Sequence, residues 1–227
     1  MMEIWKTLIL LQNNLEAAFD RTGTEISEPG MERFNQPGWV NRVWTSDSYR
    51  RAHVDVVDAR QSKGLWMMHC CVFPQLHNDG PIFGLDVIAG KHKITGFFHD
   101  YSPTTNANHQ MIDDFADATE STVWKKTREL PDWAKQIFTE SMIAAGNIND
   151  PEELQKLFDF SNESITNYLM EIGTYNNRSD PEIGKKLQNR YAHYQKQNPH
   201  TPKTMKALGL NEADVDIFVR ECLFPDI

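Results

Sequence analysis

The chain has 227 residues, of which 40% are hydrophobic and 24% are charged, and its formal net charge is -9 at pH 7. This composition excludes collagen-like, coiled-coil and intrinsically disordered chains, and the length favours one domain or two small ones. Because no repeat or interdomain linker is evident, we predict a single domain over residues 1–227. The negative charge argues against a general nucleic-acid-binding protein, because most of the surface would repel a polyanion.

Cysteine usage and the first residues predict the cellular setting. Cys70 and Cys71 are adjacent and Cys222 is distant, which gives neither a disulfide framework nor a zinc-binding spacing. The apolar stretch at residues 8–11 is too short for a signal peptide or a membrane span. We therefore expect a cytoplasmic protein with no membrane association and no structural metal.

The first half of the chain reads as one helix followed by strands. Apolar residues at helical spacing predict an amphipathic helix over residues 2–20, which Gly23 terminates. From residue 38 to residue 101, short runs rich in Val, Ile, Phe and Trp alternate with turn-forming clusters, a pattern typical of an antiparallel meander. The predicted strands are residues 40–45, 52–59, 65–73, 82–89 and 94–100.

The second half reads as helices. Asp150-Pro151 and Asp180-Pro181 each place Asp at a helix N-cap and Pro at the first helical position. The predicted helices are residues 111–128, 132–145, 151–173, 181–197 and 212–223. Because both alternating faces of residues 65–73 are largely apolar, helices must cover both sides of the sheet. The predicted fold class is α+β, an α/β/α sandwich with a central antiparallel sheet.

Polar residues interrupt these apolar strands at Asp55, His69 and Asp86. If each hairpin is symmetric about the centre of its loop, Asp55 faces His69, His69 faces Asp86, and Asp86 faces Thr95. The four side chains would then form one row on one face of the sheet, although a slip of one residue in any hairpin would move a member to the other face.

Three interpretations of the row remain open at this stage. The structural one is that the carboxylates are neutralised by pairing through His69, because a buried charge is costly without a partner. The functional one is a proton-transfer site, since carboxylates beside a partly buried histidine shift each other's pKa values toward neutrality. A metal site is a third option, but a nearly flat row suits convergent ligands poorly.

A basic segment stands out against the acidic average. Between Gly184 and Asn211 there are six basic residues and no Asp or Glu: Lys185, Lys186, Arg190, Lys196, Lys203 and Lys206. We call these residues the basic stretch. It is typical either of a solvated helix face or of a surface that binds a small anion or an acidic protein.

Several segments, in the right order along the chain, resemble the ferredoxin-dependent bilin reductases. They include YRRAHVD at 49–55, PIFGLDVIAG at 81–90, SPT at 102–104, RELPDW at 128–133 and LFP at 223–225. The resemblance implies an α/β/α sandwich and a monomer that reduces biliverdin IXα with single electrons from a reduced 2Fe–2S ferredoxin. No bound flavin or metal is implied, because electrons enter the bilin itself and side chains supply protons through radical intermediates.

The resemblance also assigns roles to residues of this sequence. Asp86 matches the family's central aspartate, and His69 matches the partner histidine of the phycocyanobilin-forming branch. Arg128 matches a residue that lines the substrate and is a candidate clamp for a propionate, and Trp133 matches an apolar wall. As structural alternatives, Arg128 would form a helix-terminal ion pair and Trp133 would be a core aromatic.

Two departures from the family pattern bear on the product. Phycocyanobilin-forming members have Glu, implicated in reducing the D-ring vinyl group, where this chain has the shorter Asp55. Many members have a distal Asp after the asparagine matched by Asn198, whereas Pro199 follows here and His200 stands where a basic residue contacts propionate. The chain is thus most similar to phage-type members that form phycoerythrobilin, which would place it in the cytoplasm of a host cell.

The leading hypothesis is a four-electron reduction of biliverdin to phycoerythrobilin, catalysed by Asp86, His69 and Asp55, with Thr95, Arg128, Trp133, Asn198 and His200 binding the substrate. Reduction to phycocyanobilin is the nearest alternative. A non-catalytic carrier of a bilin or haem is an alternative from a different class, in which the row anchors pyrrole nitrogens. In addition, Gly84 beside Asp86 is predicted to leave room for a flat ligand.

Overall fold

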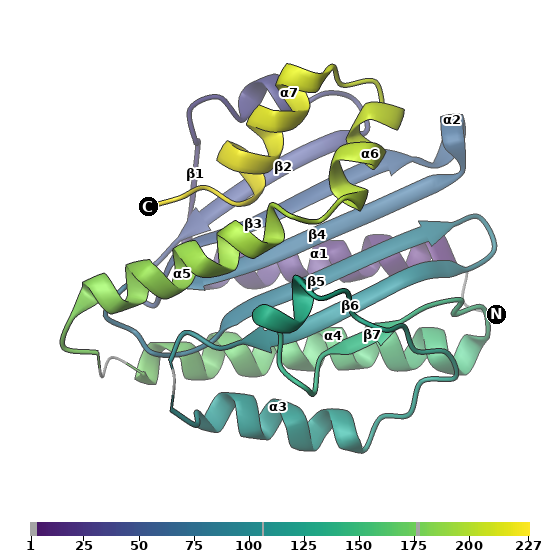
Figure 1. Ribbon diagram of the computed structural model, residues 1–227. Helices are drawn as coiled ribbons and strands as arrows, with labels where there is room; N and C mark the ends of the chain where they lie inside the picture. The colour runs from purple at the N-terminus through teal and green to yellow at the C-terminus, as the bar shows by residue number, and fades with distance from the viewer. Residues whose placement is uncertain (1–3, 106, 176–177) are drawn as a thin grey trace.

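The computed structural model describes residues 4–105, 107–175 and 178–227. Within these ranges the chain forms a seven-stranded antiparallel sheet whose strands neighbour one another in sequence order (Figure 1). The strands are β1 (Thr24–Ile26), β2 (Trp39–Thr45), β3 (Tyr49–Ala59), β4 (Leu65–Pro74), β5 (Ile82–Gly90), β6 (Ile94–Ser102) and β7 (Ile143–Ala145). The predicted meander is therefore confirmed and is extended by one short strand at each edge.

Helices cover both faces of the sheet, as the apolarity of β4 predicts (Figure 1). One face packs against α1 (Ile4–Thr22), α3 (Gln110–Glu120) and α4 (Pro151–Glu171). The other face packs against α5 (Pro181–Gln195), α6 (His200–Ala207), α7 (Glu212–Ile217) and the π-helical segment η4 (Phe218–Leu223). Shorter segments are α2 (Arg60–Lys63) in the β3–β4 turn, η1 (Glu32–Phe34), η2 (Ala134–Gln136) and η3 (Ile172–Thr174).

Two apolar cores result, one on each face of the sheet. Trp44, Trp66 and Phe83 are fully buried in the core shared with α1 and α4, and Phe73 and Phe218 in the core shared with α5 and η4. This is the expected α/β/α sandwich. Of the helices in the described ranges, none combines the length and the apolar character that a bilayer crossing requires.

The predicted helix starts at Asp150 and Asp180 are confirmed. The Asp150 carboxylate accepts hydrogen bonds from the backbone N–H groups of Glu152 and Glu153, and Asp180 accepts one from Glu182. Pro occupies the first turn in both helices, where its missing N–H costs nothing. Met2 and Glu3 of the predicted first helix lie outside the described residues.

The helix predicted at 111–128 is wrong in extent, and the one predicted at 132–145 is wrong, because that range forms only the short 3-10 segment η2 and the strand β7. α3 ends at Glu120, where the hydroxyls of Ser121 and Thr122 bond to the carbonyl of Ala118 and close the helix. Residues 143–145 form β7, which pairs with Phe97–His99 of β6. Pairing with an otherwise open sheet edge therefore outweighs the local helix propensity of Ala144 and Ala145.

The C-terminal region also differs from prediction. The last predicted helix is divided between α7 and η4, and the helix predicted at 181–197 ends at Gln195. A further helix that the sequence did not predict, α6, begins at His200, and Pro199 and Pro202 both fall at its beginning, where proline is tolerated.

Candidate functional site

Three strands bring the predicted polar residues into line. Asp55 of β3 is the register partner of His69 in β4, and His69 is the register partner of Asp86 in β5. Two of the three predicted pairings are therefore confirmed. We call Asp55, His69 and Asp86 the polar row, which lies on the sheet face that α5, α6 and η4 cover.

The third predicted pairing is wrong. Asp86 faces Phe98, because the β5–β6 turn closes between Gly90 and Lys93 and the register shifts again near Thr95. A β-bulge adds a residue to one strand and re-aims its side chain. The Thr95 hydroxyl consequently donates to the carbonyl of Ile88 at 3.1 Å and lies away from Asp86.

A pocket of about 420 Å³ opens over the polar row, within the usual size range of small-molecule sites. All eight residues that the sequence singled out line it: Asp55, His69, Asp86, Thr95, Arg128, Trp133, Asn198 and His200. The structure thus gathers into one cavity side chains from β3, β4, β5, β6 and the segments before α6 and η2.

His69 and Asp86 form a hydrogen-bonded pair at the pocket floor. His69 Nδ1 lies 2.7 Å from Asp86 Oδ1, and the Asp86 side chain is 41% exposed while that of His69 is 13% exposed. Burial by itself would lower the pKa of His69, but the charge and hydrogen bond of Asp86, together with the charge of Asp55, outweigh burial and raise it. The pair therefore consists of a readily protonated imidazole and, in front of it, a carboxylate that a ligand in the pocket can reach.

Asp55 lies deeper. Its side chain is buried, and the indole Nε1 of Trp39 donates a hydrogen bond of 2.6 Å to its Oδ1. Burial raises the pKa of Asp55 to about 7, although the hydrogen bond from Trp39 and the charge of His69 act in the opposite direction. Asp55 is consequently a carboxyl group that exchanges its proton near neutral pH.

His53 is a member of the site that the sequence reasoning missed. It is fully buried on the same face of β3 as Asp55, with its ring centre 6.1 Å from that of His69. Burial lowers its pKa well below the usual value, so the ring is neutral at pH 7. The two-residue alternation from His53 to Asp55 was the signal that could have found it.

The pocket walls are apolar. Phe98 and Phe138 line it, together with Met67, Ile88 and Met142. The Phe224 ring lies edge-on to the His69 ring at 5.5 Å, so the C-terminal segment covers part of the polar row. The Tyr191 hydroxyl occupies the space beside Gly84, since a Cβ at Gly84 would lie 3.3 Å from it. The prediction that Gly84 makes room for a flat ligand is therefore wrong.

The remaining predicted binding residues lie around the edge of this cavity. The Arg128 guanidinium is exposed, bonds to the carbonyl of Thr95 and stands 5.7 Å from the centre of the Phe98 ring. Trp133 is half-buried, as a wall residue would be. Asn198 accepts a hydrogen bond from the backbone of His200, which fixes the start of α6 at the pocket edge.

The basic stretch is not one uniform surface. Lys196 is largely buried and paired with Asp226, and Lys206 is paired with Glu212. Lys203 is exposed and has no ion pair within the described ranges. Thr201, Thr204 and Met205 of α6 face the pocket. Lys203 and Lys206 therefore lie on the opposite, outer side of this helix, close to the pocket.

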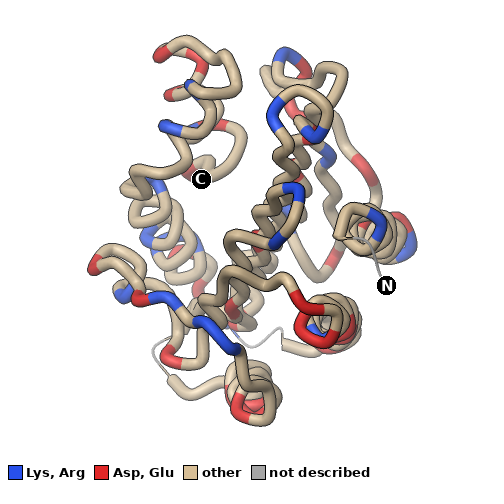
Figure 2. Tube along the Cα trace, turned by 90° about the vertical axis from the view of Figure 1, so that its right-hand side faces the viewer, with Lys and Arg blue, Asp and Glu red and all other residues tan. Residues whose placement is uncertain are grey.

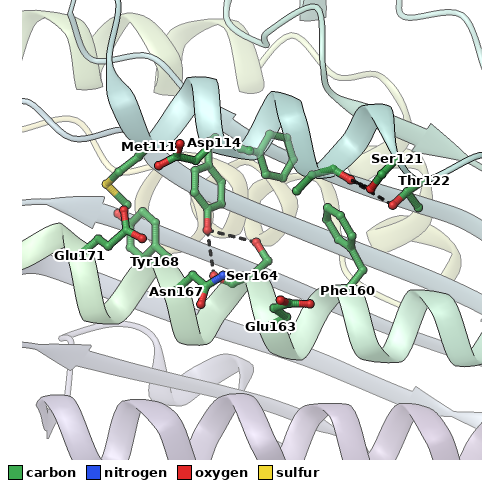
Figure 3. Close-up of a pocket in the computed structure, with 13 residues that line it drawn as sticks. Met111, Asp114, Ser121, Thr122, Phe160, Glu163, Ser164, Asn167, Tyr168 and Glu171 are labelled. Atoms are coloured by element: carbon green, nitrogen blue, oxygen red, sulfur yellow. Dashed lines mark hydrogen bonds between the residues drawn. The ribbon is translucent and has the colours of Figure 1, made fainter.

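A second pocket, of about 270 Å³, lies on the opposite face of the sheet between α3 and α4 (Figure 3). Its floor carries the Tyr101 hydroxyl, which donates to the carbonyl of Ser164 at 2.8 Å. Asp114, Glu163 and Glu171 surround it, and these acids disfavour an anionic ligand. Within the described ranges no three His, Cys, Asp or Glu residues are placed to hold a metal ion.

An antiparallel sheet between two helical layers, with a titratable pair under an apolar cavity, defines a protein that can exchange protons with a bound organic molecule. A family model described as ferredoxin-dependent bilin reductase matches residues 11–225. The chain belongs to this family and is an oxidoreductase.

Phycocyanobilin:ferredoxin oxidoreductases are among the curated relatives. That of Synechococcus sp. (strain CC9605) is 27% identical over 194 residues, which cover 81% of this chain and 74% of the relative. That of Synechococcus elongatus is 30% identical over 180 residues, which cover 77% of this chain and 71% of the relative.

Two solved structures share the fold. The structure of PcyX is 35% identical, with a TM-score of 0.74 and coverage of 97% of this chain and 99% of that one. Phytochromobilin synthase from tomato, in complex with biliverdin, is 15% identical with a TM-score of 0.73 over 95% of this chain and 81% of that one. Its low identity makes it evidence for the fold alone.

Proposed function

We propose that this protein reduces biliverdin IXα to phycoerythrobilin, taking four electrons, one at a time, from reduced ferredoxin. The observation that carries the proposal is the hydrogen-bonded pair of His69 and Asp86 under an apolar pocket in a bilin reductase chain. The 35% identity to PcyX over nearly the whole of both chains also supports it.

In the proposed mechanism the bilin itself accepts the electrons, and Asp86 together with His69 supplies the protons. Four electrons and four protons enter the substrate, so each one-electron step is balanced by one proton. Asp86 is the central donor, because its carboxyl group is the most exposed of the row, and His69 restores its proton through their hydrogen bond. Arg128 and His200 at the pocket edge bind the propionates.

The choice of product follows from where protons can be delivered. Relative to a glutamate, the oxygens of Asp55 are withdrawn by about 1 to 1.5 Å, which impairs a transfer that needs heavy atoms within about 3 Å. Reduction of the D-ring vinyl group is then slower than protonation at the A-ring and at the C15 bridge, which leads to phycoerythrobilin. No carboxylate follows Asn198, so Asp86 or ordered water acts twice.

The test is an anaerobic reaction of the purified protein with biliverdin, ferredoxin and a ferredoxin-reducing system. Chromatography is expected to show phycoerythrobilin as the main final pigment, in the absence of added flavin or metal. Phycocyanobilin as the main pigment would contradict the product assignment. A shifted absorption spectrum with no new pigment would contradict catalysis altogether.

The proposal includes the setting in which the protein works. We propose a monomer in the cytoplasm, with no bound flavin or metal, and a phage-type origin with activity in the host cell. Gel filtration of the biliverdin complex with light-scattering detection tests the monomer, and metal and flavin analysis of the purified protein tests the absence of a cofactor.

A further inference from the structure

We propose that Trp39 is a positioning residue that holds the Asp55 carboxyl group in one orientation and keeps it from donating a proton to the bound bilin. The inference about the product rests on the function proposed above. The inference about Asp55 itself concerns the ligand-free protein and stands independently.

The contact is short and shielded from water. Trp39 Nε1 lies 2.6 Å from Asp55 Oδ1, and Trp39 and Asp55 are only 3% and 4% exposed. Trp39 is the register partner of Val57, so it reaches Asp55 diagonally across the β2–β3 pair. A hydrogen bond to a charged acceptor is stronger than a neutral one, which favours the ionised form of Asp55.

Aromatic packing holds the indole in this position. The Phe218 ring stands edge-on to Trp39 at 5.0 Å, the Phe34 ring lies at 6.2 Å, and these two phenyl rings are 4.9 Å apart. Phe34 belongs to η1 and Phe218 to η4, so segments far apart in the sequence close around the indole. The direction of the Trp39 N–H is therefore fixed. The Asp55 oxygen that accepts its hydrogen bond is fixed as well.

Neighbouring polar groups do not take over this role. Asn41 is the register partner of Asp55, but its Oδ1 lies 3.0 Å from His53 Nε2 and its Nδ2 is directed at Asn35. The other titratable groups around Asp55 are His53 on β3, His69 on β4, Asp86 on β5 and Cys222 on η4. Among the described residues, Trp39 alone hydrogen-bonds to the Asp55 side chain.

The consequence is a carboxyl group that lines the pocket with one oxygen committed to the protein. Breaking the bond would make Asp55 easier to protonate and free it to turn toward the ligand. The Trp39 contact then acts with the short side chain of Asp55 to suppress reduction of the vinyl group. Trp39 thereby contributes to product specificity without touching the reacting atoms.

The experiment compares W39F, D55N and the double variant W39F/D55N. The Asp55 C=O stretch is identified by infrared spectroscopy as the band that D55N removes, and it is titrated in ligand-free protein. We expect W39F to raise the titration midpoint by about one pH unit, a tenfold change in the acid constant. W39F is also expected to increase the phycocyanobilin share of the products several-fold, and to change nothing further in the D55N background.

W44F is the matched control. Like Trp39, Trp44 is buried, packs on an aromatic ring and donates a hydrogen bond to a carboxylate, in this case that of Asp20 at 2.8 Å. Unlike Trp39, it lies on the other face of the sheet. W44F is expected to lower stability and to leave both the Asp55 titration and the product ratio unchanged.

Two results would overturn the inference: an unchanged Asp55 titration in W39F, or an equal effect of W39F on the product ratio with and without Asp55. The second would mean that the indole acts through packing alone. If the native protein forms no phycoerythrobilin while W39F still shifts the Asp55 titration, the proposed product fails and the role of Trp39 on Asp55 stands.

Discussion

At the scale of single residues, the polar row places three acid–base groups in three different environments. Asp86 is the one the ligand can reach, His69 lies behind it, and Asp55 is buried. A general acid must be within hydrogen-bonding reach of its substrate, so access ranks Asp86 first. This ranking gives each member of the row a separate test.

Replacing Asp86 by Asn keeps the shape of the side chain and removes its proton. We expect D86N to bind biliverdin with similar affinity and to turn over at least about a hundredfold more slowly, the scale of losing a general acid. Anaerobic single-turnover kinetics measure this. Normal turnover by D86N would remove Asp86 from the mechanism.

In the proposed mechanism His69 acts through Asp86. The H69Q variant removes the group whose pKa the Asp86 carboxylate raises. We expect it to change the absorption spectrum of bound biliverdin and to slow the first reduction, because the row can no longer replace the Asp86 proton quickly. An unchanged spectrum and rate would mean that His69 only neutralises a buried charge.

Asp55 should make stability depend on pH. Burial raises its pKa to about 7 from the usual 3.8, so between these values the folded state holds a proton that the unfolded state has lost. The contribution of Asp55 to the free energy of unfolding therefore falls as pH rises from about 4 to about 7, by a few kcal/mol at most. Relative to D55N, the native protein should lose stability across this window in urea titrations.

Asp58 supplies the control for this measurement. It lies on the same strand, but its hydrogen bond to Arg60 lowers its pKa, so D58N removes a contribution of the opposite sign. A difference between native protein and D55N that stays constant with pH would show that Asp55 keeps one charge state in both folded and unfolded chains.

At the scale of elements, the segment between η2 and β7 forms one wall of the pocket and is tied to the sheet by Asp100. The Asp100 carboxylate is buried on β6 and accepts hydrogen bonds from the Thr139 backbone and hydroxyl and from Ser102. Phe138 precedes Thr139 and lines the pocket. Asp100 thus positions a wall of the site through Thr139.

Removing the Thr139 hydroxyl should loosen this wall. We expect T139V to raise the KM for biliverdin roughly tenfold and to change kcat little, because a hydrogen bond to a charged group contributes about 1.5 to 3 kcal/mol. T139S keeps the hydroxyl and should behave as the native protein. Equal KM values for T139V and T139S would show that the wall is held by other contacts.

The elements also show what the sequence could and could not predict. Alternating apolar residues and hairpin symmetry placed Asp55, His69 and Asp86 side by side, because short-range geometry sets a register. The bulge at Thr95 adds a residue inside the β5–β6 hairpin, which hairpin symmetry does not announce, and β7 pairs with β6 across the intervening α3 and η2. The hydrogen bond from Trp39 to Asp55 depends on how two side chains are oriented across neighbouring strands, which the strand pattern does not fix.

At the scale of the whole molecule, charge is distributed unevenly over an acidic protein. α3 carries Asp113, Asp114, Asp117 and Glu120 and no basic residue, on the face away from the polar row. Basic residues occur around the end of the molecule where α2, α6 and the β5–β6 turn lie (Figure 2). We expect an acidic electron donor to approach that end, because basic residues attract it there.

Lys203 and Lys206 test this surface. Both are exposed on the outer side of α6, beside the pocket, but Lys206 is partly neutralised by Glu212, so Lys203 should contribute more to attraction. We expect K203E/K206E to raise the ferredoxin concentration for half-maximal rate about tenfold at low salt. The loss of rate on adding salt should be weaker, because charge attraction is screened within about 8 Å at physiological ionic strength.

A variant with the same change of charge on another surface separates two effects: the local attraction of ferredoxin to α6 and the net charge of the whole protein. R21E/K156E reverses basic residues on α1 and α4, which cover the other face of the sheet. It should keep the native ferredoxin dependence at every salt concentration if position decides the encounter, and should match K203E/K206E if only net charge matters. Identical kinetics of K203E/K206E and native protein at low salt would show that this part of the basic stretch is a solvated helix face. Electron entry would then have to be sought beside Arg128, an exposed cation that lines the pocket.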